Sequence, residues 1–176
     1  MNAALAGKLG LVRDRETLYA EAMGELSPAL ARVAAGYEAD RELRRDLLQD
    51  MHTALWRSLE NFDGRCSLKT WTWRVAHNVG ATHLGTRRRR FVELEEVSVE
   101  SDVEAKIDRA RALNRLTQLV HALKAGDRQL VLLYLEGLEA TAISEVTGLT
   151  PSNVATKIHR IKAALARSFT KGLRHE

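Results

Sequence analysis

Five polar or cationic side chains near the end of the chain share one side of a predicted helix: Asn153, Thr156, Lys157, His159 and Arg160. Amide, hydroxyl, imidazole and cationic groups bind the base edges and phosphates of a DNA major groove. The other side of this helix is apolar, with Val154, Ile158, Ile161 and Leu165 at helical spacing. The chemistry that this pattern predicts is non-covalent recognition of DNA.

A shorter predicted helix precedes this one across a tight turn. Its apolar stripe consists of Ala142, Ile143 and Val146. Gly148 can adopt the left-handed conformation that ends a helix, Thr150 suits an N-cap, and Pro151 suits a first helical position. Helix, glycine turn and cationic second helix are typical of a helix-turn-helix DNA-binding unit. An ordinary helical hairpin is the alternative interpretation.

Another candidate nucleic-acid face lies on the helix predicted from Ser67 to Thr86. It carries Trp73, Arg74, His77 and Asn78, and the same end continues into Arg87, Arg88, Arg89 and Arg90. Unpaired bases stack on aromatic rings while arginines follow the phosphates, so this set suits single-stranded nucleic acid. Trp71 falls in the inward stripe of this helix and is expected in the core, whereas Trp73 fits either the core or a stacking role.

Enzyme chemistry finds little support in the residue pattern. The glycines lie singly, so they form no phosphate-binding loop, and no GxSxG motif is present. Asp46 and Asp50 are one helical turn apart, but Arg44 and Arg45 adjoin them and indicate a surface charge cluster. We therefore predict no catalytic residues. The histidines His52, His77 and His121 are expected at surface or half-buried positions.

The sequence also predicts neither a metal site nor a cofactor. The six histidines lack the companion spacings of zinc ligands. Cys66 is the single cysteine, which excludes an internal disulfide and fits a reducing cytoplasm. Lys8, Arg13 and Arg15 interrupt the first apolar run, so we expect neither a signal peptide nor membrane insertion.

Composition and charge predict an all-α protein of two small helical domains. Strong helix formers dominate the 176 residues, which include only two prolines. The net charge of +4 is unevenly distributed, because the four arginines precede a strongly acidic stretch from Glu93 to Asp108. Such asymmetry indicates a polyanionic partner and an acidic linker. The expected domains are residues 1–90 and 108–176, joined by a linker over 91–107.

Two more helices are expected in the first domain. One runs from about Thr17 to Ala35, where Pro28 could break it or start a new helix. The other is indicated by an apolar residue every fourth position: Leu47, Met51, Leu55 and Leu59.

These motifs together resemble an extracytoplasmic-function sigma factor, a promoter-recognition subunit of bacterial RNA polymerase. The first domain is similar to region 2 of that family, in Asp46-Leu-Leu-Gln-Asp50, Leu55-Trp56, Phe62-Asp-Gly64, Ser67-Leu-Lys-Thr-Trp71 and Arg74-Val-Ala-His-Asn78. The second is similar to region 4, in Leu119 to Leu123, Leu130-Val-Leu-Leu-Tyr134, Glu136-Gly-Leu138, Ile143, Asn153-Val154 and His159-Arg160. Two motif sets in the correct order are more specific than either alone.

The resemblance implies an alternative sigma factor that binds core RNA polymerase and promoter DNA, with an anti-sigma factor as a further partner. Region 4 would read the −35 element, and the polymerase would bind the face around Arg44, Asp46, Gln49, Asp50 and Thr53. A flipped-out base of the −10 element would enter the loop of Phe62, Asp63, Gly64, Arg65 and Ser67. The Trp73 to Asn78 face would hold the neighbouring DNA.

Five positions depart from the family pattern. Arg44 and Arg45 replace acidic residues, Thr82 and Gly85 stand where Asp and Arg are usual, and Ala155 replaces a basic residue. Because of these departures, an alternative interpretation stays open: a degenerate sigma-like protein that binds an anti-sigma factor without initiating transcription. A helix-turn-helix regulator that acts without polymerase is the other alternative, although no dimerisation helix is evident.

Overall fold

The computed structural model of the protein describes residues 14–90 and 107–173, and it describes side chains over 14–86 and 112–169. The described residues are helical apart from short turns, and no strand occurs among them, which confirms the all-α prediction. The elements in chain order are α1 (Arg15–Tyr37), α2 (Arg41–Ser58), a 3-10 turn η1 (Leu59–Asn61), α3 (Leu68–Arg90), α4 (Ile107–His121), α5 (Ala125–Leu135), α6 (Ala140–Thr147) and α7 (Pro151–Leu173).

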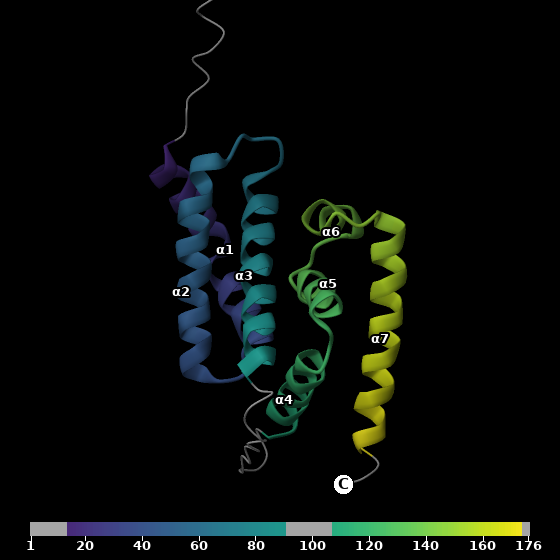
Figure 1. Ribbon diagram of the computed structural model, residues 1–176. Helices are drawn as coiled ribbons and strands as arrows, with labels where there is room; N and C mark the ends of the chain where they lie inside the picture. Colours follow the sequence, from purple (N-terminus) through teal and green to yellow (C-terminus); the bar gives the residue numbers. More distant parts are fainter. Residues whose placement is uncertain (1–13, 91–106, 174–176) are drawn as a thin grey trace, which may run out of the picture.

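Helices α1, α2 and α3 pack together as one bundle (Figure 1). Asp14 and Asp40 cap α1 and α2 by accepting hydrogen bonds from backbone amides in the first turn of each helix. Pro28 neither breaks α1 nor starts a new helix, contrary to one expectation, since α1 continues through it to Tyr37. The neighbouring Ala29 and Leu30 are buried in the bundle, and their packing offsets the backbone hydrogen bond that Pro28 cannot donate.

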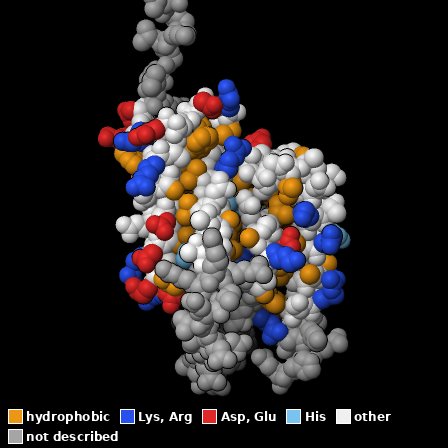
Figure 2. All heavy atoms as spheres, viewed as in Figure 1, with side chains coloured by type: hydrophobic (Ala, Val, Ile, Leu, Met, Phe, Trp, Pro, Cys, Tyr) orange, Lys and Arg blue, Asp and Glu red, His pale blue; other side chains and the backbone are white. Residues whose placement is uncertain are grey.

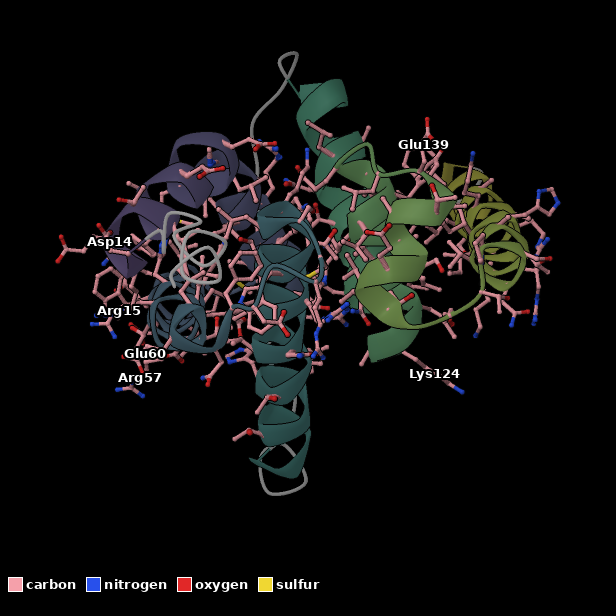
Figure 3. All side chains as sticks on the ribbon, turned by 90° about the horizontal axis from the view of Figure 1, so that it is seen from above. Asp14, Arg15, Arg57, Glu60, Lys124 and Glu139 are labelled. Atoms are coloured by element: carbon pink, nitrogen blue, oxygen red, sulfur yellow. The ribbon has the colours of Figure 1, made fainter. Side chains whose placement is uncertain are left out.

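Helices α4 to α7 form the second unit. In Figure 1, α4, α5 and α6 lie between α3 on one side and α7 on the other. Figure 3 shows the same order from above, with α7 on the side of the molecule remote from α1 and α2. The first and second units are therefore in contact through the middle helices, and α7 is held on the outside.

One hydrophobic core runs through both units. It joins residues of the first bundle, such as Leu30 and Trp73, to residues of the second, such as Leu130, Ile143 and Ile158. A smaller cluster lies at the η1 end of the first bundle, around Leu18 and Leu55. The two helical units thus bury apolar surface against each other as well as within themselves.

Within the described ranges, every helix is too short or too polar to cross a bilayer.

Candidate nucleic-acid interface

The turn between α6 and α7 has the geometry that its residues predict. Gly148 lies in the left-handed region at φ +73°, and its amide donates to the Ser144 carbonyl at 2.8 Å. Thr150 Oγ1 accepts a hydrogen bond from the Asn153 amide at 3.3 Å, which places Thr150 at the N-cap of α7. Ser144 Oγ donates to the Leu149 carbonyl at 2.6 Å and adds a second tie across the turn. The predicted helix-turn-helix is confirmed.

Helix α7 separates its apolar and polar sides as expected. Val154, Ile158 and Ile161 are buried in the core. All five predicted contact residues are exposed: Asn153, Thr156, Lys157, His159 and Arg160. Figure 2 shows Lys, Arg and His side chains along the α7 edge of the molecule. This surface therefore presents donors, acceptors and positive charge to solvent, which is the arrangement that a major-groove contact requires.

The candidate face on α3 is mostly buried, because the second unit covers most of it. Trp73 and His77 are each only 1% exposed. Arg74 is half-buried, and its Nη2 donates to the Glu145 carbonyl of α6 at 2.7 Å. Asn78 alone of the four is exposed. The structure brings Trp73, Arg74 and His77 together on α3, but Arg74 is bonded to α6, His77 is bonded to Tyr37 of α1, and Trp73 is buried in the core.

The expectation that His77 is at most half-buried is wrong. Its Nδ1 shares a 2.9 Å hydrogen bond with the Tyr37 hydroxyl, and its ring packs near Trp73 at 6.0 Å between centroids. Burial lowers the pKa of His77 to about 3 and raises the pKa of the Tyr37 hydroxyl above its usual range. His77 is consequently neutral in the folded chain at physiological pH.

The two tryptophans of α3 also differ from the expected order of burial. Trp71 is half-buried rather than fully enclosed, and its Nε1 donates to Ser58 Oγ at 2.9 Å. Trp73 is the more deeply buried ring. Trp71 packs against the smaller cluster around Leu18 and Leu55, whereas Trp73 belongs to the main core, which also contains residues of the second unit. No residue near Trp73 in the sequence indicates this second partner.

The loop before α3 is held from both ends. The Phe62 and Trp71 rings pack edge to face at 5.5 Å, and Ser67 Oγ accepts from the Thr70 amide at 3.0 Å to cap α3. Between them Asp63 pairs with Arg65 at 3.1 Å, and Gly64 takes a positive φ of +73°. Four residues of the loop are exposed: Asp63, Gly64, Arg65 and Ser67. Phe62 is half-buried, so the loop presents an aromatic ring in a fixed position beside these exposed residues.

The outer face of α2 is exposed at all four candidate positions: Asp46, Gln49, Asp50 and Thr53. The buried residues Leu47, Met51 and Leu55 fix their orientation by holding the opposite face in the core. Arg44 does not join the exposed group. It is half-buried, and its Nη2 donates to the Ala39 carbonyl at 2.8 Å beside the start of α2.

Some predictions fall on residues that the structure does not describe. Helix α3 extends to Arg90, but the side chains of Arg87, Arg88, Arg89 and Arg90 lie outside the described part, as does the linker over 91–106. Within the described part, no group of three histidine, cysteine or acidic residues is placed to hold a metal ion.

Sequence reasoning missed Glu145, which both Thr70 and Arg74 contact from α3. Glu145 sits on the polar side of α6, where an unpaired surface carboxylate is the ordinary expectation, so no local signal could have identified it.

Two family models match the chain in sequence order. Sigma-70 region 2 matches residues 23–90, and Sigma-70, region 4 matches residues 113–165. Two curated relatives cover most of the chain. The RNA polymerase sigma factor YlaC of Bacillus subtilis is 27% identical over 77% of this chain and 82% of its own length. The RNA polymerase sigma factor CnrH of Cupriavidus metallidurans is 26% identical over 78% and 79%.

Two solved structures share the fold. CnrH in complex with the cytosolic domain of CnrY superposes with a TM-score of 0.66 at 20% identity, covering 90% of this chain and 91% of that one. The sigma factor RpoE in complex with the anti-sigma factor NepR from Bartonella quintana gives a TM-score of 0.67 at 18% identity, covering 87% and 96%.

Proposed function

The chain belongs to the sigma-70 family of RNA polymerase sigma factors, and from this premise we propose which of its surfaces carries each step of promoter recognition. It is an alternative sigma factor that binds core RNA polymerase and directs promoter recognition and transcription initiation. One observation supports this assignment of surfaces above all. The polar residues of α7 are exposed, because the apolar residues on the opposite side of the helix are buried in the core.

Helix α7 reads the −35 element in its major groove. Thr156 and His159 are the base readers, because short polar side chains near the start of a recognition helix reach base edges. Lys157 and Arg160 anchor the phosphates, and Asn153 lies closest to the helix start. Ala155 leaves the row without an arginine that could pair with guanine through two hydrogen bonds, so specificity at −35 is modest.

The exposed face of α2 is the polymerase contact. Asp46, Gln49, Asp50 and Thr53 lie on a rigid helix whose other side is in the core, so their positions are fixed before the partner arrives. Figure 2 shows Asp and Glu side chains at this edge of the molecule, opposite to α7. Polymerase docking and −35 reading thus use opposite sides of the chain.

The −10 element is handled by region 2. A flipped-out base enters the loop from Phe62 to Ser67, where the Phe62 ring offers a stacking surface and the exposed polar groups offer hydrogen bonds. Arg74 and Asn78 hold the adjacent single strand by polar and phosphate contact, with Trp73 and His77 buried beside them, and Arg87 to Arg90 add charge at the C-terminal end of α3.

An anti-sigma factor is a partner of this chain, as the complexes of CnrH with CnrY and of RpoE with NepR suggest by likeness. The chain works in the cytoplasm, where polymerase and promoters are found, and it has no catalytic role of its own. Residues 1–90 and 108–176 are its two domains, and the acidic linker of 91–107 threads positively charged channels of the polymerase.

Transcription in vitro tests this function. Core RNA polymerase and sheared genomic DNA of the source organism are incubated with the chain, and run-off transcripts are sequenced. We expect transcripts that share one promoter motif, and none without the chain. The double variant Gln49→Ala/Asp50→Arg should lose both transcripts and co-purification with core enzyme.

The matched control for that variant is Glu16→Arg, which reverses an exposed charge on α1 away from the proposed contact. It should transcribe like the wild type. Absence of any promoter-specific transcript from the wild-type chain would contradict initiation, and wild-type binding by the double variant would contradict the α2 contact.

A further inference from the structure

Ala155 lies on the proposed recognition helix, but the proposed function gives it no contact with DNA. It is exposed in the second turn of α7 and directly precedes the proposed base reader Thr156. His159, the other proposed reader, follows Ala155 by four residues and therefore lies one turn further along the same side of the helix. Ala155 is thus at the edge of the surface that would enter the −35 major groove.

An open groove of about 580 Å³ adjoins Ala155. Its walls come from α5, the turn that follows, α6 and α7, which pack together in the second unit (Figure 1). Most of the side chains that line it are apolar, among them Leu135, Leu138, Ala140 and Ile158. Among the described residues that line this groove, only Glu139 carries a charge. The groove therefore offers contact to apolar groups and no positive charge to phosphates.

The cationic side chains of α7 are directed away from Ala155. Lys157 and Arg160 leave the helix roughly 140° or more around its axis from Ala155. Lys162 shares the side of Ala155 but lies two turns further along. Its Nζ donates to the Tyr134 hydroxyl at 3.0 Å and lies 4.8 Å from the ring centre, so both contacts hold this charge against α5. A base opposite Ala155 would accordingly meet a methyl group and no cation.

The DNA major groove presents one apolar group that suits such a surface. Thymine carries its C5-methyl group there, whereas the edges of guanine, adenine and cytosine present hydrogen-bonding groups. Guanine is read through two hydrogen bonds from arginine or lysine, and an alanine side chain has no donor for them. An alanine methyl group does contact the thymine methyl group. The surroundings of Ala155 therefore favour thymine over the other three bases.

We propose that Ala155 and the groove beside it form a subsite for the 5-methyl group of one thymine in the −35 element. The subsite lies next to the bases assigned to Thr156 and His159, and it rests on the proposed role of α7 in reading −35 DNA. Ala155 is then a specificity-determining residue, because it replaces a hydrogen-bonded base contact by an apolar one.

Exchange of thymine for uracil tests the subsite, because deoxyuridine lacks the methyl group and keeps the hydrogen-bonding groups of thymine. The complex of the chain with core RNA polymerase first selects duplexes from a library randomised over the −35 element. Each thymine of the selected element is then replaced singly by deoxyuridine, and competition binding compares the two duplexes. We expect one thymine whose replacement weakens binding by the wild type about fourfold, as for the loss of one buried methyl-sized group.

Three variants of the chain assign this effect to a residue. Ala155→Ser has a similar size but replaces the methyl surface by a hydroxyl, so it should bind the thymine and uracil duplexes equally well. Ala155→Lys supplies a hydrogen-bond donor and should select guanine at the same position. Ala166→Ser is the matched control, because Ala166 is exposed on the same side of α7 three turns further along, and it should keep the wild-type difference. Circular dichroism checks that all three fold.

Two results would overturn the subsite and leave the proposed reading of −35 DNA intact. One is a selected −35 element in which no thymine responds to uracil. The other is an undiminished response in Ala155→Ser; loss of the response in Thr156→Ser would then assign the contact to the methyl group of Thr156. If the wild-type complex enriches no −35 sequence at all, the proposed role of α7 is wrong, and the subsite is wrong with it.

Discussion

Acidification should destabilise the folded chain through His77. Burial lowers its pKa to about 3, whereas an exposed imidazole in the unfolded chain has a pKa of 6.5. The unfolded state therefore binds a proton between these values that the folded state does not. The stability that neutral His77 contributes is complete above the unfolded pKa and is lost as the pH falls. Linkage gives a loss of about 1.4 kcal/mol between pH 7.5 and pH 5.5.

Urea denaturation followed by circular dichroism at the two pH values measures this loss. The matched variant is His77→Gln, which keeps a polar group for the Tyr37 hydroxyl and removes the titrating ring. His52 and His121 also have a pKa lowered by burial, but they are present in both chains and cancel in the comparison. The wild type should lose about 1.4 kcal/mol more than the variant. Equal losses in the two chains would refute the reasoning.

Three further outcomes are expected. Gly148→Ala should lower the free energy of unfolding by about 1–2 kcal/mol, because alanine at φ +73° is strained; a urea midpoint equal to that of the wild type would contradict this. In a −35 promoter-library selection, Thr156→Ala or His159→Ala should change the preferred sequences, whereas Lys157→Ala should weaken all of them alike; an unchanged preference in both former variants would show that the reading face is misassigned. Replacing Arg87 to Arg90 together by alanine should flatten the log–log salt dependence of DNA binding by roughly 3–4, and an unchanged slope would show that these arginines do not meet phosphates.

The helix-turn-helix could be predicted in detail because its determinants are local. The φ of Gly148, the Thr150 cap and the burial of Val154 and Ile158 all follow from residue types within a few positions of one another. The exposed row on α7 followed from the same periodicity.

The environment of the α3 face could not be predicted, because it depends on residues about 70 positions away. Helix α3 has two sides that can pack, and periodicity shows that both are partly apolar without showing which partner each will meet. Trp73 and His77 therefore fitted a solvent-facing role equally well. The burial of Trp73 and His77 and the contact of Arg74 and Thr70 with Glu145 reveal in the structure that this side is covered.

We expect Arg44 and Arg45 to weaken the proposed polymerase contact of α2 less than their sequence positions suggest. Arg44 turns back to the Ala39 carbonyl at 2.8 Å, so its charge lies at the start of α2 rather than on the outer face. Arg45 pairs with Glu42 at 3.2 Å, one turn earlier on the same helix. Both arginines are thus engaged at the N-terminal end, whereas Asp46 and Asp50 point outward beyond them. Asp46 and Asp50 therefore keep the negative charge that a basic surface of the polymerase clamp would recognise. We expect the replacement of acidic residues by Arg44 and Arg45 to shift the proposed polymerase contact along α2 rather than abolish it.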